Sequence, residues 1–176
     1  MPTCTLLKKP SARAALIAAF CLTTFGALPA ETLADGWRFV KGDLADPLEA
    51  ATGAWQQVTL PHTWNAADAA DGGWHEPPGD PGYYRGPGWY AKALTSDPTW
   101  KDRRVFLRFG AVSSVAEVVL NGKPVAEHKG PATAFASEIT GVLKPAGTND
   151  LRVRADNTLR PEVPPLSGDF PVFGGI

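Results

Sequence analysis

Oxygen-bearing side chains gather in one stretch of the sequence, where they could bind a cation. Asn65, Asp68 and Asp71 recur every third residue, and carboxylate and amide oxygens are ligands that hard cations prefer. Turn formation and capping account for Asp and Asn in such a stretch more simply. Three histidines fit no common zinc spacing and are interpreted as structural or solvent-facing: His62, His75 and His128.

The sequence has no G-x-S-x-G elbow, no glycine-rich phosphate loop and no Cys–His pair. Glycoside hydrolysis needs two carboxylates about 5–9 Å apart, and nothing in the sequence nominates such a pair. Most acidic residues stand singly beside Gly, Pro or Lys, as surface groups do. The residues taken alone therefore do not indicate an enzyme.

Short runs in which apolar and polar residues alternate are the elements that would position these side chains. Alternation with period two predicts strands, and Asn121-Gly122 between two apolar runs predicts a tight hairpin. We find no convincing helical period, so the pattern predicts an all-β sandwich or barrel. The predicted strands lie within residues 37–40, 55–61, 88–94, 103–110, 117–128 and 149–157. Residues 135–149 are predicted to form a further strand, a short turn of helix and a loop marked by Gly147.

Residues 62–88 interrupt this rhythm with a long stretch rich in Gly, Pro, Asp and aromatic residues. A loop of this length without regular structure is usually either functional or disordered. Aromatic residues are depleted in disordered segments, which makes disorder the weaker interpretation. We expect an ordered loop at one end of the sandwich.

The N-terminal segment has the organisation of a secretory signal peptide. Basic residues Lys8, Lys9 and Arg13 precede the uncharged apolar run 14–28, and Ala30 offers a small-residue cleavage site. The alternative is a membrane anchor, but the run is short against the roughly 20 residues that span a bilayer. We expect a signal peptide at 1–30, a domain at 31–176, a periplasmic or secreted product, and no stable membrane association after cleavage.

The positions of the cysteines and the net charge argue against a disulfide in the domain and against a nucleic-acid partner. Cys4 and Cys21 both lie in the predicted signal peptide, so cleavage would leave the domain without a disulfide. The net charge is −1 and there is no basic stripe, which argues against a nucleic-acid partner. All six tryptophans follow residue 30, and aromatic side chains of this kind suit sugar faces as well as cores.

Several stretches, taken in order, resemble one known family. They are LPHTWN at 60–65, YYRGPGWY at 83–90, the run 104–135, GTNDLRVRADN at 147–157 and PLSGDFPVFGGI at 165–176. This order is similar to the N-terminal sugar-binding domain of glycoside hydrolase family 2, β-galactosidase type. The resemblance covers the chain from about residue 37 to its last residue.

The resemblance implies a galactose-binding-like jelly-roll β-sandwich. In the family an immunoglobulin-like domain and a (β/α)8 barrel follow, and the barrel holds two catalytic glutamates. On this view the sequence stops before the last strand of the jelly roll and is an N-terminal fragment that is inactive alone. Members include β-galactosidases, β-glucuronidases and β-mannosidases, which leaves the glycoside open.

Two residues are candidates for contact with a carbohydrate. The resemblance matches Asp169 to a family aspartate that binds sugar hydroxyls, with no cofactor and with a sodium ion nearby only in a full-length enzyme. The other interpretation of Asp169 is a turn aspartate after Ser167-Gly168. Asn65 lies on the long loop, which in relatives of this type is on the active-site side. The resemblance assigns a sugar contact to Asn65 less strongly than to Asp169. Two alternative hypotheses stay open. In one, the chain aggregates through an unpaired sheet edge. In the other, the chain is a non-catalytic carbohydrate-binding module, with exposed aromatic side chains at Trp64, Trp74, Tyr83 or Tyr84 that stack on sugars.

Overall fold

The computed structural model describes residues 4–10, 30–44, 55–70, 84–164 and 173–176. Within them the chain forms ten strands, one short helix and a 3-10 turn at Pro98–Trp100. The elements are β1 (Cys4–Pro10), β2 (Ala30–Thr32), β3 (Trp37–Lys41), β4 (Gln56–Val58), α1 (Asn65–Ala70), β5 (Pro87–Thr95), β6 (Arg103–Phe109), β7 (Val115–Leu120), β8 (Lys123–Lys129), β9 (Phe135–Glu138) and β10 (Thr148–Asp156).

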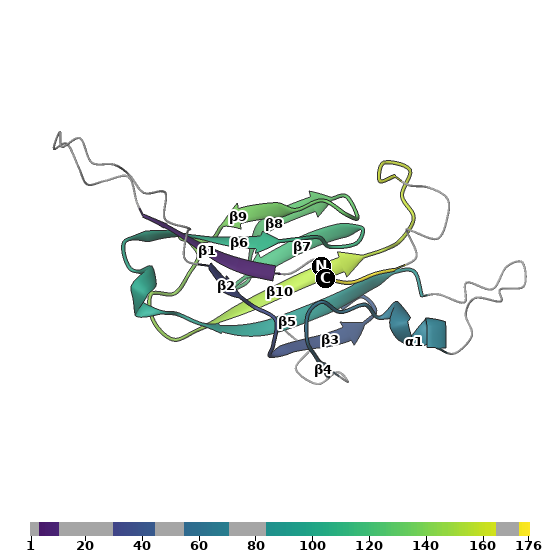
Figure 1. Ribbon diagram of the computed structural model, residues 1–176, viewed down its shortest axis with the longest axis horizontal. Coiled ribbons are helices and arrows are strands. Elements are labelled where there is room, and N and C mark those ends of the chain that lie inside the picture. The colour runs from purple at the N-terminus through teal and green to yellow at the C-terminus, as the bar shows by residue number, and fades with distance from the viewer. Residues whose placement is uncertain (1–3, 11–29, 45–54, 71–83, 165–172) are drawn as a thin grey trace, which may run out of the picture.

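These strands form two antiparallel sheets that lie against each other (Figure 1). The smaller sheet has the order β2-β1-β6-β9, and the larger has the order β4-β3-β5-β10-β7-β8. Strands adjacent in a sheet are often far apart in sequence; β10, for example, lies between β5 and β7. The predicted all-β sandwich is confirmed.

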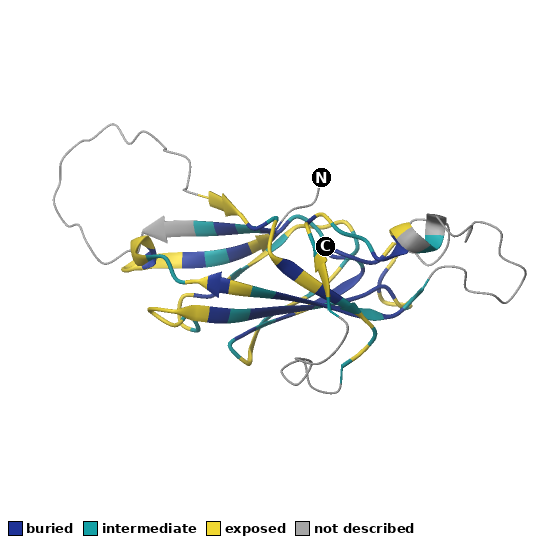
Figure 2. Ribbon diagram, turned by 90° about the horizontal axis from the view of Figure 1, so that it is seen from below, coloured by how far each residue is buried: buried dark blue, intermediate teal, exposed yellow. Residues whose placement is uncertain are grey.

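One hydrophobic core joins residues from both sheets. Buried residues alternate with more exposed ones along several of the strands (Figure 2). Along β6 the side chains of Val105, Leu107 and Phe109 are buried, as the alternation of the sequence predicts. Leu151 and Val153 of β10 face them from the larger sheet and are fully buried. The period-two pattern therefore identified the correct inner faces.

The predicted hairpin at Asn121-Gly122 is also confirmed. Asn121 has φ 53° and Gly122 has φ 76°, the left-handed pair that a two-residue turn between β7 and β8 requires. The side chain of Asn121 adds two donated hydrogen bonds, to the Val142 carbonyl (2.9 Å) and to Asn149 Oδ1 (2.8 Å). This turn ties the hairpin to the loop before β10.

A short helix corrects the prediction that residues 62–88 lack regular structure. Helix α1 spans only six residues of sequence NAADAA, which is less than two turns. A hydrophobic period cannot show in so short a run, although alanine has the highest helix propensity. Its first residue, Asn65, donates its backbone N–H to Thr63 Oγ1 (3.3 Å). The part of the chain that the structure describes has no helix long and apolar enough to cross a membrane.

Strand β1 comes from the segment that the sequence assigns to the signal peptide. It pairs with β6 along its whole length and with β2 over three residues. Cys4 and Leu6 belong to the core, with exposures of 1% and 0%. The sequence predicted no strand here, because the basic head of a signal peptide and a short strand can share one pattern. Removal of residues 1–30 stays a prediction.

Candidate functional site

The last four residues fasten two loops at one end of the sandwich. His62 N–H donates to the Ile176 carbonyl (2.8 Å), and Ile176 N–H donates back to the His62 carbonyl (3.1 Å). On the other side, Ser113 N–H donates to the Gly175 carbonyl (3.1 Å). The tail 173–176 therefore lies between the 61–64 loop and the 111–114 loop, bonded to both.

Both glycines of the tail are required by close packing. A Cβ atom on Gly174 would lie 1.9 Å from the Trp64 ring, and one on Gly175 would lie 2.0 Å from the His62 carbonyl oxygen. Contacts under 3.0 Å are not found for real Cβ atoms. Only glycine lets the tail approach the loop closely enough for the backbone hydrogen bonds to form.

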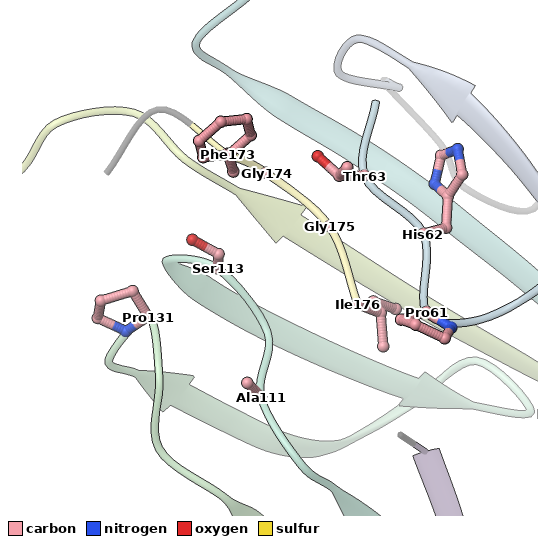
Figure 3. A pocket seen from close by; sticks show the side chains of 10 residues that line it. All are labelled: Pro61, His62, Thr63, Ala111, Ser113, Pro131, Phe173, Gly174, Gly175 and Ile176. Carbon is pink, nitrogen blue, oxygen red and sulfur yellow. The ribbon is translucent and has the colours of Figure 1, made fainter. Parts of the chain in front are cut away.

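A cavity of about 300 Å³ lies along this tail (Figure 3). Its size is near the lower end of the range for small-molecule sites. The hydroxyl-bearing side chains of Thr63 and Ser113 lie on either side of the tail, with Phe173 at one end and Pro61 at the other. Phe173 is 37% exposed, so its ring offers an apolar surface at the rim. An apolar wall with a few hydroxyls is an arrangement that suits one face of a sugar ring.

Asn65 fixes the tail from beneath. Its Nδ2 donates to Asp68 Oδ2 (2.7 Å) and to the Tyr84 carbonyl (3.0 Å), while its Oδ1 accepts from Gly174 N–H (2.7 Å) and from Asn157 Nδ2 (3.4 Å). Its amide thus uses two donors and two acceptor positions on protein partners, and the residue is 0% exposed. The structure gives Asn65 a positioning role. It leaves no exposed polar atom on this side chain for a direct sugar contact.

Asp68 completes this group of hydrogen bonds. Burial would raise the pKa of Asp68, but the Tyr84 N–H, the Asn65 amide and the Lys41 ammonium outweigh burial and hold the pKa below its ordinary value. The Lys41 Nζ–Asp68 Oδ1 distance is 3.4 Å. Asp68 is therefore an ionised structural carboxylate. The less favoured alternative, a cation bound by Asn65, Asp68 and Asp71, gains no support from the structure. Asn65 and Asp68 bond to each other, Asp71 lies outside the described residues, and no group of three His, Cys, Asp or Glu side chains that could hold a metal ion occurs within those residues.

His62 faces away from the tail, toward the strands beneath it (Figure 3). Its Nδ1 lies 2.7 Å from the Tyr90 hydroxyl, and its ring packs on Phe39 with centroids 4.9 Å apart. Burial lowers the pKa of His62, because it removes the water that would stabilise the charged imidazolium. Burial likewise raises the pKa of Tyr90. The neutral pair supports the floor of the site and offers no ready acid or base at its surface.

The aromatic residues predicted to stack on sugars are placed differently from expectation. Trp64 is 4% exposed and stacks on Phe39 with centroids 5.5 Å apart and planes 9° apart, so the prediction of an exposed Trp64 is wrong. Its indole N–H is buried and has no hydrogen-bond partner in the described part of the chain. Tyr84 is half-buried and donates its hydroxyl to the Pro87 carbonyl (3.0 Å). Trp74, Tyr83 and Asp169 lie outside the described residues.

Sequence reasoning missed Asn157 and Ser113. Asn157 ends the run after β10, accepts from Gly86 N–H (2.8 Å) and lies within 3.4 Å of Asn65 Oδ1, which joins three distant segments. Nothing local distinguishes it from an ordinary turn asparagine. Ser113 is recognisable only through its pairing with Gly175, a contact between residues far apart in sequence.

Comparison with known proteins agrees with this architecture. Residues 85–164 match the family described as glycosyl hydrolase 2 galactose-binding domain-like. The chain carries a family 2 galactose-binding-like domain. The resemblance noted in the sequence motifs is thereby confirmed, and so is the galactose-binding-like fold.

Individual relatives are glycosidases by name. A β-glucuronidase of Bacteroides fragilis is 46% identical over 121 residues, 69% of this chain and 16% of that protein. A β-galactosidase of Thermoanaerobacter pseudethanolicus is 36% identical over 96 residues, 53% of this chain and 13% of that protein. The solved Bacteroides uniformis β-glucuronidase superposes with a TM-score of 0.71 at 38% identity, covering 83% of this chain and 16% of that one. The chain thus spans less than a fifth of the length of these relatives.

Proposed function

We propose that this chain is the sugar-binding domain of an exported family 2 glycoside hydrolase that acts on terminal β-glycosides. The observation that carries the proposal is the 46% identity over 121 residues to a β-glucuronidase, on a domain whose fold is of the same kind. The cavity along the tail supports it, because an apolar wall with hydroxyls suits a pyranose. By the resemblance, the two catalytic glutamates belong to a later barrel.

Asp169 is the substrate-contacting carboxylate of this proposal. An ionised carboxylate accepts from two sugar hydroxyls at once in charge-assisted hydrogen bonds, which are stronger than neutral ones. The sequence places it between Pro164 and Phe173, and Phe173 lies at the rim of the cavity. Asn65 acts through its bond to Gly174 N–H, which holds the tail that follows this segment. A β-glucuronide or a β-galactoside is the ligand that the names of the relatives favour.

Sugar titration followed by NMR tests the proposal. With methyl β-glucuronide and methyl β-galactoside added to the full chain, we expect shifts at cavity residues such as Thr63 and Ser113, and no hydrolysis of the corresponding nitrophenyl glycosides. Asp169→Asn should weaken binding about tenfold, because a hydrogen bond to a charged group contributes roughly 1.5 kcal/mol or more.

Asp102→Asn is the matched control, since Asp102 is exposed with φ 59°, a conformation that asparagine also adopts. No shift with either sugar at tens of millimolar would contradict sugar binding by this domain. Equal affinity in Asp169→Asn would remove only the role of Asp169.

The proposal includes export of the protein, which the basic and apolar head of the sequence supports. N-terminal sequencing of the product from a cell that expresses the full chain measures it directly. We expect a periplasmic or secreted product that begins at Glu31. A cytoplasmic product that retains Met1 would contradict export.

A further inference from the structure

A second cavity, of about 650 Å³, lies at the end of the sandwich away from the tail. Its two walls are the turn at Pro98–Trp100, between β5 and β6, and the loop 140–145, between β9 and β10. The tail lies at the other end, where Asn65 bonds to both Gly174 and Asn157, the residue that follows β10. Figure 1 shows the 98–100 turn and helix α1 at opposite ends of the molecule. This second cavity, here called the turn cavity, shares no lining residue with the cavity along the tail.

Asn149 fixes both walls of the turn cavity from beneath. Its side chain is 0% exposed; Nδ2 donates to Ser96 Oγ (2.9 Å) ahead of the turn, and Oδ1 accepts from Lys144 N–H (2.8 Å) in the loop. Ser96 Oγ in turn donates to the Lys144 carbonyl (2.6 Å), which bonds one wall directly to the other. The cavity is therefore held open by the fold itself, and such preorganisation lowers the entropic cost of binding a ligand.

The inside of the turn cavity is mostly apolar. Trp100 from the turn is 7% exposed, and Val105 from β6 is 1% exposed. Leu143 and Pro145 complete the opposite wall from the loop. Cavities of this size, with apolar walls and a few charged groups at fixed points, are the usual form of a small-molecule site. The walls therefore suit a flat apolar body.

The rim of the turn cavity carries an excess of positive charge, although the net charge of the whole chain is −1. Two acidic side chains, Asp97 and Asp102, stand among four basic ones, which are Lys101, Arg103, Arg104 and Lys144. Asp97 is already engaged, since its Oδ1 accepts from Thr99 N–H (2.7 Å) and caps the turn. An anionic group at this rim would therefore be attracted rather than repelled.

Two of the basic side chains are engaged with the protein and two are not. Arg104 pairs with Glu138 (Nη2–Oε2 2.6 Å), and Lys144 Nζ donates to the Thr148 carbonyl (3.3 Å). Within the described part of the chain, Arg103 and Lys101 have no such partner for their side chains.

Arg103 is the residue whose place the sandwich alone does not explain. Alternation along β6 puts it on the same face as the buried residues Val105 and Leu107, at the point where the sandwich opens to solvent. A hydrophobic side chain would serve the core better at such a position. A guanidinium instead offers a rigid fork of donors, which binds a carboxylate through two parallel hydrogen bonds.

We propose that the turn cavity binds an organic carboxylate with a flat apolar body, whose carboxylate pairs with Arg103 at the rim. Trp100, Val105 and Leu143 line the space for the apolar body, and Lys101 adds positive charge beside the carboxylate. The charged pair stays at the exposed rim, so binding avoids the cost of burying an ion pair. This site is independent of sugar binding along the tail, and failure of either proposal leaves the other in place.

Titration of the full chain with 2-naphthoate, followed by NMR, tests the proposal, and 2-naphthamide is the matched uncharged probe. We expect 2-naphthoate to shift the amide resonances of wall residues such as Ser96, Thr99 and Leu143, and to leave those of Thr63 and Ser113 beside the tail unchanged. The affinity for 2-naphthamide should be at least about fivefold lower, because it lacks the charge that Arg103 attracts. No shift with about 10 mM 2-naphthoate, or equal affinity for the two probes, would overturn the proposal.

Substitution of Arg103 identifies the group that holds the carboxylate. Arg103→Gln should weaken binding of 2-naphthoate about tenfold and leave binding of 2-naphthamide within about twofold. Arg103→Lys keeps the charge without the fork and should cost about threefold. Arg108→Gln is the matched control, since Arg108 is exposed on the other face of β6 and removes the same charge from the chain. Equal losses in Arg103→Gln and Arg108→Gln would show a net-charge effect only, and would overturn the proposal.

Discussion

At the scale of single residues, His62 gives the site a pH dependence of stability. Burial lowers the pKa of His62 below its ordinary value of 6.5, so the unfolded chain binds a proton more readily than the folded chain between these two values. The free energy of unfolding should therefore fall as pH drops from about 7 through 6.5, and level off below the folded pKa. Urea denaturation between pH 5 and pH 8 measures this slope.

Substitution of His62 separates its contribution from that of other groups. His62→Gln should flatten the stability profile between pH 5 and pH 7. The pKa of Asp68 is held below its ordinary value of 3.8, so its contribution is lost only at lower pH. An unchanged slope in His62→Gln would show that the titrating group in this window is a different one.

The sequence alone predicted the structural roles of some of these residues and not of others. The left-handed pair Asn121-Gly122 was predictable because the requirement for positive φ is local to two residues. Trp64 was predicted to be exposed, yet its ring lies on Phe39 and beside Gly88. That burial depends on the return of a distant strand, which no local pattern contains. For the same reason Asn65 could be marked as a candidate, while its four partners could not.

At the scale of elements, the tail and the 61–64 loop depend on each other through Gly174. Gly174→Ala should lower the free energy of unfolding by about 1–3 kcal/mol or more, because its Cβ would overlap the buried Trp64 ring. Gly141→Ala is the matched control, since a Cβ there meets nothing within 4 Å and should change stability by less than about 0.5 kcal/mol.

The same pair of variants reports on the site. Gly174→Ala should shift the amide resonances of Thr63 and Ser113, whose loops the tail joins, and Gly141→Ala should not. Two variants of equal stability would mean that the tail does not pack on Trp64 as described.

At the scale of the whole molecule, one core joins both sheets, so the domain should unfold as one unit. Leu107→Ala in β6 and Leu120→Ala in β7 should each cost about 2–5 kcal/mol, because both side chains are 0% exposed. Leu159→Ala is the matched control at 44% exposure and should cost less than about 0.5 kcal/mol. Urea titrations followed by fluorescence and by circular dichroism measure these differences.

Coincident transitions by both probes are expected for each variant. Two separate transitions, one affected by Leu107→Ala and the other by Leu120→Ala, would show that the sheets are stable independently. The alternation of residues 103–110 was sufficient to place Leu107 on one face with Val105 and Phe109, because period two sorts the two faces of a strand. Leu120 follows two valines in a continuous apolar run, so its burial was not predicted in this way. The order of strands within each sheet was not predictable in this way, since β10 pairs with two strands that precede it.

The bonds of the tail to two loops have a mechanical consequence. Gly175 bonds to Ser113 on one side of the tail, and Ile176 bonds to His62 on the other. Neither loop can therefore move outward without pulling on the tail. A load applied at Ile176 is shared between both loops and has to break several hydrogen bonds together. The tail therefore acts as a stiff coupling, through which a displacement of the last residue becomes a change in the width of the cavity.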